Sequence, residues 1–156
     1  MVDNYEVKKM TVTDKTRVEC FMLCDGAEEC NGKLFVLGGG WDQLRGRGFP
    51  LTHHQLAIAI RLSVPWNDAN CPQRFRIESL DEDGNDILPQ PLEGTFNVGR
   101  PATVGVGDDL SIVLAINMVN LIFPRPGVYV FRLLVEGEEL AKTRLRASTV
   151  GQVYSS

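Results

Sequence analysis

The sequence predicts an all-β protein, an antiparallel β-sandwich of about eight or nine strands. Apolar and polar residues alternate with period two in several stretches, most clearly over residues 55–64. Turn-forming residues separate these stretches, and the chain contains 15 Gly and 8 Pro. No stretch of a dozen residues repeats apolar positions at helical spacing, so helices are expected to be single turns at most. Short strands without interposed helices favour a sandwich, because the chain is short for a ligand-holding barrel.

The length of 156 residues fits one domain. Residues 1–15 are polar and are expected to form an N-terminal tail. Residues 16–148 are expected to form the single sandwich domain, and residues 149–156 a C-terminal tail. No internal repeat or domain boundary interrupts this arrangement.

The first predicted strand begins at Val18 and alternates up to residue 24. Its cysteine-containing face, which begins with Val18, is expected to be buried, whereas Phe21 and Leu23 lie on the face assigned to solvent. Residues 25–33 have the composition of a turn, and residues 33–42 predict a buried strand that ends near three consecutive glycines. The two strands are therefore expected to form a hairpin.

The central strands are predicted from alternation and from bracketing turns. Residues 55–64 place branched apolar side chains on one face and smaller or polar ones on the other. Residues 74–78 form the next strand, which turns at residues 81–86 and returns through residues 87–88. Residues 93–98 add a short strand.

A loop rich in Gly and Pro is predicted over residues 99–109, before the last three strands. Residues 109–120 alternate with period two. Residues 128–136 and 139–147 form a hairpin, in which Gly137 can adopt the positive φ of a tight turn.

Several strands carry branched or aromatic side chains on the face assigned to solvent. Together they would form an apolar patch larger than a monomer normally exposes. We therefore expect a protein partner, most simply a second copy related by a two-fold axis. The alternative is cover by residues 1–15 or by the 99–109 loop. The predicted interface residues are Phe21, Leu23, Val113, Val119, Val128, Val130 and Leu134.

The charge balance argues against two classes of partner. The 16 Lys and Arg are outnumbered by 20 Asp and Glu, so the net charge is −4. A negative chain opposes binding to nucleic acid and to anionic membranes. No apolar stretch approaches the roughly 20 residues of a membrane-spanning helix, and the N-terminus does not resemble a secretory signal. These features predict a cytoplasmic protein.

Groups for catalysis are few. The chain has two adjacent histidines, and no serine occurs in a nucleophile-elbow motif. Cys20, Cys24, Cys30 and Cys71 lack the spacing of common zinc modules and are expected to be free thiols. The best case for an enzyme pairs Cys24 or Cys71 with His54. We nevertheless predict no catalytic residue, no cofactor, no metal site and no established small-molecule ligand.

Two loops suggest alternatives. Residues 81–86 crowd carboxylates around a glycine, as calcium sites do, although a hairpin turn accounts for the same residues. Residues 41–54 form either a lid on the sandwich or the wall of a pocket. The predicted pocket residues are Trp41, Asp42, Arg45 and His54.

A set of short motifs, spread over most of residues 17–146, carries a family resemblance. The first half contains Phe21-Met22-Leu23-Cys24-Asp25, Glu28-Glu29, Asn31-Gly32-Lys33-Leu34, Leu37-Gly38 and Trp41-Asp42. The second half contains residues 117–124, Pro126-Gly127-Val128-Tyr129 with Phe131, and Glu136-Gly137-Glu138-Glu139-Leu140-Ala141.

These motifs resemble a family of small uncharacterised bacterial proteins, a domain of unknown function. The resemblance implies an immunoglobulin-like β-sandwich and provides no catalytic residue to carry over. Cys30, His53, His54 and Cys71 lie outside the pattern, which argues against a metal or thiol chemistry common to the family.

The sequence therefore predicts a non-catalytic interaction or assembly module. The alternative is a small ligand-binding protein or a thiol-dependent enzyme that uses the 41–54 region.

Overall fold

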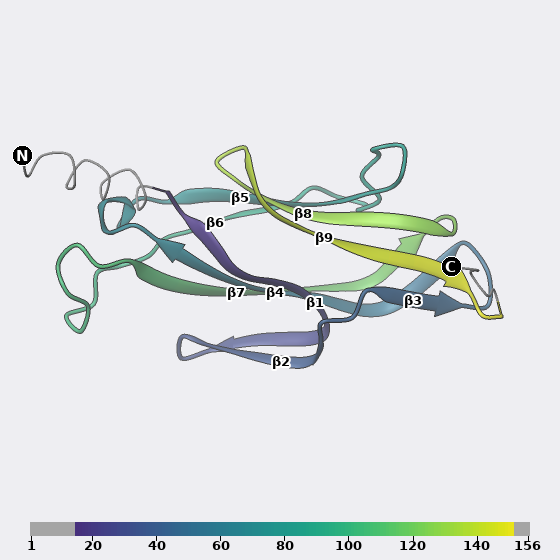
Figure 1. Cartoon of the computed structure of the whole chain (residues 1–156), viewed down its shortest axis with the longest axis horizontal. Coiled ribbons are helices and arrows are strands. Elements are labelled where there is room, and N and C mark those ends of the chain that lie inside the picture. The colour runs from purple at the N-terminus through teal and green to yellow at the C-terminus, as the bar shows by residue number, and fades with distance from the viewer. Residues whose placement is uncertain (1–14, 152–156) are drawn as a thin grey trace, which may run out of the picture.

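The computed structural model describes residues 15–151, which form two β-sheets packed face to face (Figure 1). The four-stranded sheet has the order β2-β1-β4-β7 and the five-stranded sheet the order β3-β9-β8-β5-β6. All pairings are antiparallel except that of β3 with β9. The predicted antiparallel sandwich is confirmed. The strands are β1 (Arg17–Cys30), β2 (Lys33–Gly39), β3 (Gln43–Gly46), β4 (Leu51–Val64), β5 (Gln73–Leu80), β6 (Leu92–Phe96), β7 (Leu110–Phe123), β8 (Gly127–Val135) and β9 (Glu138–Thr149).

The strand order identifies an immunoglobulin-like topology. Strands β1, β4 and β7 correspond to A, B and E of that fold, and β5, β8 and β9 correspond to C, F and G. Strand β6 takes the C′ position beside β5. Within residues 15–151 no strand occupies the D position beside β7, so the four-stranded sheet is completed on its other side by β2.

A tyrosine corner fixes the connection between the two sheets. The hydroxyl of Tyr129, at the start of β8, donates to the carbonyl of Arg125 at 2.5 Å and accepts the Arg125 N–H at 3.3 Å. The Tyr129 ring is buried and meets the ring of Phe123 edge-on at 5.0 Å. The same device, at the same place in the chain, is typical of immunoglobulin-like domains.

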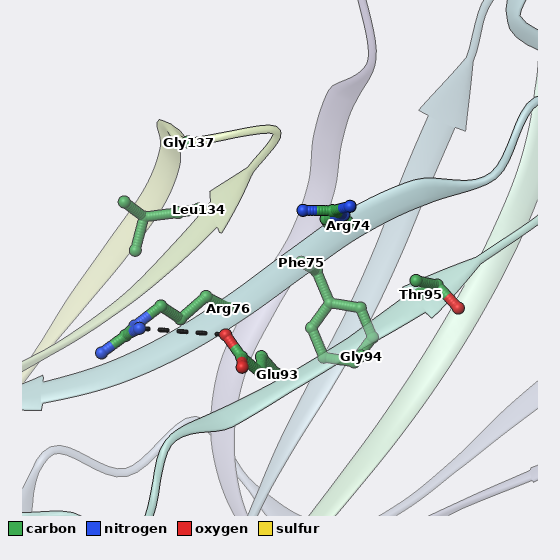
Figure 2. A pocket seen from close by; sticks show the side chains of 8 residues that line it. All are labelled: Arg74, Phe75, Arg76, Glu93, Gly94, Thr95, Leu134 and Gly137. Carbon is green, nitrogen blue, oxygen red and sulfur yellow. Dashed lines mark ion pairs between the residues drawn. The ribbon is translucent and has the colours of Figure 1, made fainter.

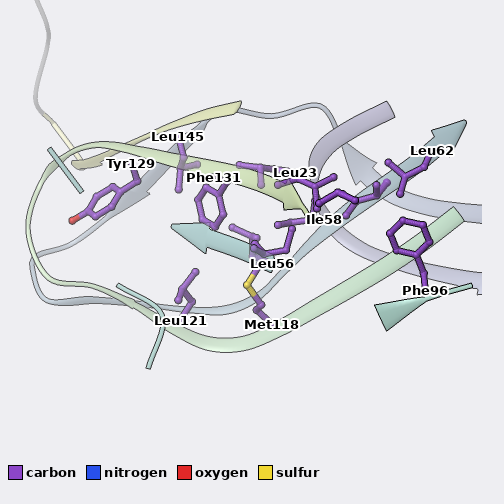
Figure 3. Packing of buried hydrophobic residues seen from close by; sticks show 14 of the residues in the cluster. Leu23, Leu56, Ile58, Leu62, Phe96, Met118, Leu121, Tyr129, Phe131 and Leu145 are labelled. Carbon is purple, nitrogen blue, oxygen red and sulfur yellow. The ribbon is translucent and has the colours of Figure 1, made fainter. Parts of the chain in front are cut away.

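The core lies between the two sheets (Figure 3). Leu56, Ile58, Ile60 and Leu62 of β4 point into it, as the alternation of residues 55–64 predicts. Side chains of β8 and β9 meet them from the five-stranded sheet. They include Tyr129, Phe131, Leu133 and Leu145.

The predicted faces of β1 are wrong. Phe21 lies opposite Ile60, and Leu23 lies opposite Ile58, so both point into the core, and Leu23 is fully buried. The register shifts between Val18 and Cys20. This bulge breaks the alternation, because the residues on its two sides no longer share a face. Val18 therefore packs against the core, whereas Cys20, Met22 and Cys24 lie on the outer face.

The hairpin of β1 and β2 is longer than predicted and covers the outer face of the four-stranded sheet. Strand β1 continues through the predicted turn to Cys30, and only Asn31-Gly32 turns the chain. Ala57 and Ala59 on the outer face of β4 are fully buried, with Ala27 and Leu34 of the hairpin packed against their cluster. Figure 1 shows the hairpin as a separate layer beneath the sheet.

Asn117 of β7 holds this hairpin in place. Its side-chain carbonyl accepts the N–H of Ala27 at 3.3 Å, and its amide donates to the carbonyl of Ala27 at 2.8 Å. One side chain therefore satisfies both backbone groups of a residue from another layer.

Strand β2 differs most from its prediction as a buried strand. Only its second residue, Leu34, is half-buried, and the six others are exposed. The reason is that the hairpin lies outside the sandwich, so a second layer covers only one of its faces.

Smaller differences concern element ends. Strand β3 is not predicted, and residues 87–88 form no strand, although Ile87 donates its N–H to Ser79 at 2.8 Å. Trp66–Asp68 form a single 3-10 turn. In the described part of the chain no helix is long and apolar enough to cross a membrane. Most of the predicted N-terminal tail, residues 1–14, and residues 152–156 of the C-terminal tail lie outside the described residues.

Tyr129→Phe should lower the free energy of unfolding by about 1–2 kcal/mol, because two partly buried hydrogen bonds to the backbone of Arg125 are lost. Urea denaturation measures this, with the slope against urea expected to stay unchanged. A loss below about 0.5 kcal/mol would show that the corner adds nothing to stability.

Asn117→Ala should loosen the hairpin without unfolding the sandwich. Loss of two hydrogen bonds predicts roughly tenfold faster hydrogen exchange at the amides of residues 26–28. Amides of β4 and β8 serve as the internal control and should keep their protection. Equal acceleration in all three regions would instead indicate a global loss of stability.

Candidate functional site

The predicted pocket residues lie in different surroundings within residues 15–151. Residues 43–46 form β3, and β4 begins at Leu51, so the 41–54 region is largely strand. Trp41 packs against the core and meets the His53 ring edge-on at 5.7 Å, while the main-chain carbonyl of Asp42 accepts the Arg146 N–H at 2.8 Å. Asp42, Arg45 and His54 are exposed, and His54 Nδ1 lies 3.4 Å from Asn120 Oδ1.

The structure does not bring a thiol to a histidine within residues 15–151. Burial raises the pKa of Cys24, with a further contribution from the charge of Asp25. Burial also raises the pKa of Cys20, against the opposing effect of Arg61. Burial lowers the pKa of His53. Raised thiol pKa values reduce the thiolate fraction, which is the opposite of what a catalytic cysteine needs.

The acidic turn at residues 81–86 uses its carboxylates for its own structure. Asp81 accepts the N–H groups of Asp83 and Asn85, both at 2.9 Å, and pairs with Arg125 at 3.2 Å. The hydrogen bond from Asn85 is the main cause of a lowered Asp81 pKa. Glu82 accepts the Val128 N–H at 2.9 Å. Among residues 15–151 no three His, Cys, Asp or Glu side chains gather as a metal site.

The predicted interface residues lie in three different places, so they do not form one patch. Leu23 is buried in the core and the partly buried Phe21 packs against it, so neither lies on the outer face of a sheet. Val113 and Val119 lie on β7, and the side chain of Val119 is 71% exposed. The remaining three share the outer face of the five-stranded sheet, where they are half-buried. They are Val128, Val130 and Leu134.

That outer face is rich in positive charge, and we call it the basic face. Along β9, Lys142, Arg144 and Arg146 point outward and lie opposite Arg132, Val130 and Val128 of β8. Its cations are Arg45, Arg74, Arg76, Arg132, Lys142, Arg144 and Arg146, and its acids are Glu78, Glu93 and Glu139.

The seven cations and three acids give the basic face a charge of +4. The rest of the chain then carries nine cations and 17 acids, a net charge of −8. This face is not among the features predicted from the sequence. Its signal was present as cations spaced by two at residues 74 and 76, and again at residues 142, 144 and 146, within predicted strands.

The ion pairs of the basic face involve Arg76 and Arg132. Arg132 contacts Glu78 at 2.5 Å and Glu139 at 3.7 Å, and Arg76 lies 3.1 Å from Glu78 and 3.8 Å from Glu93. Within residues 15–151, Arg45, Lys142 and Arg144 form no ion pair.

A hollow of about 420 Å³ lies at the β5–β6 end of the basic face (Figure 2). The ring of Phe75 lies across Gly94, where a β-carbon would come within 2.9 Å of it, so only glycine fits there. Glu136 accepts the backbone N–H of Arg74 at 2.5 Å, which ties the β8–β9 turn to β5 beside the hollow. Its lining consists of Arg74, Phe75, Arg76, Glu93, Gly94, Thr95, Leu134 and Gly137.

Thiol reactivity tests the electrostatics of the cysteines. At pH 7.5 iodoacetamide should modify the exposed Cys30 and Cys71 first, and Cys24 at least about tenfold more slowly. Because its pKa is raised, Cys24 should react appreciably only at more alkaline pH. Peptide mass spectrometry measures each site, with urea-unfolded protein as the control in which all four react alike. Fastest reaction at Cys24 would contradict this assignment.

Two solved structures are distantly similar to the chain. An immunoglobulin-like protein of Pseudomonas aeruginosa is 10% identical, with a TM-score of 0.38 over 87% of this chain and 98% of that one. The alkylpurine DNA glycosylase AlkC of Pseudomonas fluorescens is 13% identical, with a TM-score of 0.40. That comparison covers 93% of this chain, which spans only 33% of the glycosylase.

No curated protein matches the sequence. A family model of unknown function, DUF6941, matches residues 19–148. This match confirms the resemblance to an uncharacterised family that the short motifs indicate. The chain, an immunoglobulin-like β-sandwich, therefore belongs to the DUF6941 family of unknown function.

Proposed function

We propose that the chain is a non-catalytic interaction module whose basic face binds an acidic surface of a partner protein. The observation that carries this proposal is the separation of charge. A chain of net charge −4 gathers seven cations on one face of one sheet. Complementary charge steers encounters and selects partners.

The apolar residues of the basic face support a protein partner. Val128, Val130 and Leu134 run along β8, the middle strand of the sheet, and Leu80 lies beside Val130 on β5. All four are half-buried and are flanked by cations on β9 and β5. An apolar centre with a charged surround is the usual organisation of a protein interface.

Nucleic acid and membranes fit the basic face less well. Apart from Phe75, which lines the hollow and packs against the core, the strands of this face present no aromatic side chain on which a base could stack. Glu78, Glu93 and Glu139 would meet phosphates directly, and the −8 charge of the remaining chain would oppose the approach of a polyanion.

A two-fold dimer that joins two basic faces also fits poorly. Such a dimer would bring the cations of β9 against their own copies or against those of neighbouring strands. Like charges across an interface cost several kcal/mol, so an acidic surface is a better partner for the basic face than a second basic face.

A reducing compartment suits the four cysteines, which are all free. We therefore propose that the module acts in the cytoplasm.

Photo-crosslinking in the native host tests the proposal. Benzoylphenylalanine replacing Val130 should give a discrete protein adduct, whereas the same group replacing the exposed Val119 of the other sheet should not. Lys142→Glu combined with Arg144→Glu should reduce the Val130 adduct about tenfold, because two attractions become repulsions. Mass spectrometry should find an acidic segment in the adduct.

Two outcomes would overturn the assignment. One is an adduct of equal yield at both positions, and the other is an adduct that survives both charge reversals. Circular dichroism of each variant checks that the sandwich remains folded.

A further inference from the structure

Strand β2 presents a run of apolar residues to water. Phe35 is 56% exposed, Val36 40% and Leu37 73%. The same strand covers the outer face of the four-stranded sheet through Leu34. Three consecutive exposed apolar residues are unusual in a folded domain unless they serve a function.

The free edge of β2 is also unprotected. Strand β2 pairs with β1 only, and within residues 15–151 no strand pairs with its other edge. From Leu34 to Gly40 the strand contains no charge and no proline, the usual means by which natural proteins block an edge. Both edges of the five-stranded sheet are protected. Edge strand β3 is only four residues long and carries Arg45, and edge strand β6 carries Glu93.

We propose that β2 pairs with β2 of a second copy, antiparallel and about a two-fold axis at Val36. This interface goes beyond the proposed function and does not depend on it. In this register Val36 lies opposite the partner's Val36, and Phe35 lies opposite the partner's Leu37. The reciprocal contact of Leu37 with the partner's Phe35 gives two aromatic–aliphatic cross-strand pairs, which stabilise antiparallel strands.

Charge complementarity at both ends of the paired strands supports a second copy as the occupant. The register places Lys33 opposite the partner's Gly39. In each copy Asp25 lies across the backbone of Gly38, where a β-carbon would collide with its carboxylate. Lys33 can therefore extend over the partner's two glycines to the partner's Asp25, and the two-fold axis repeats this ion pair.

The other edge of the four-stranded sheet fits a second copy less well. Strand β7 exposes Val119 and Ile122, but Leu121 between them is buried. Asn117, at the centre of β7, already binds the hairpin. Strand β2 therefore offers the longer continuous apolar edge.

Light scattering on a sizing column at about 100 µM tests the pairing, because an interface of one strand is small and its affinity is expected to be in the micromolar range. The wild type should be dimeric. Phe35→Lys combined with Leu37→Lys should be monomeric, since lysine on an edge blocks strand addition. Val119→Lys is the control: it places lysine at an exposed apolar residue on the opposite edge of the same sheet and should remain dimeric.

Mixing of charge variants tests the register. Lys33→Asp should be monomeric, because acidic groups then face each other, and Asp25→Lys should be monomeric for the opposite reason. An equimolar mixture of the two variants should form a heterodimer, in which both ion pairs are restored. Native mass spectrometry distinguishes the heterodimer by mass, and its appearance also shows that both variants are folded.

A monomeric wild type would overturn the proposal. A dimer that is split by Val119→Lys but persists in the doubly substituted β2 variant would place the interface on β7 instead. Failure of the mixture to form heterodimers would reject the register. Binding of an acidic partner at the basic face is measured separately by the Val130 adduct, so failure of either proposal leaves the other standing.

Discussion

Both faces of β4 must be shielded from water, and the rest of the structure depends on this constraint. Its large side chains, such as Ile58 and Ile60, fill the space between the sheets. Ala57 and Ala59, on the opposite face of the strand, are also fully buried. Alanine allows another layer of backbone to approach closely, so the β1–β2 hairpin can lie on the outer face. A strand with two buried faces needs such a second layer, because the five-stranded sheet covers only one of them.

The hairpin that supplies this cover creates an exposed surface of its own. Leu34 faces the sheet, and Asn117 binds the hairpin backbone at Ala27, but within residues 15–151 no further layer lies beyond β2. The hairpin therefore buries the two alanines but leaves Phe35 and Leu37 exposed to water. A partner strand paired with β2 would cover this exposed surface. The packing of β4 would then be linked, through the hairpin, to the assembly of two copies.

Local alternation was sufficient to predict the sandwich and the core face of β4, because that strand continues its pattern without interruption. It failed for β1, where one bulge between Val18 and Cys20 reverses which side chains face the core. It also failed for β3, which has four residues and depends on parallel pairing with the distant β9. The basic face escaped prediction for the same reason: its cations lie on strands far apart in sequence, and only the sheet register brings Arg144 and Arg76 to one face.

The β2 edge and the basic face lie on opposite sides of the molecule. In Figure 1 the β1–β2 hairpin lies on the far side of the four-stranded sheet from β8 and β9. A dimer joined through β2 therefore leaves both basic faces open, one on each copy. Two linked sites bind a partner that repeats its acidic surface more tightly than one site can, because the second contact becomes intramolecular. The proposed self-association through β2 and the proposed recognition through the cations of β9 would use separate residues, so neither would weaken the other.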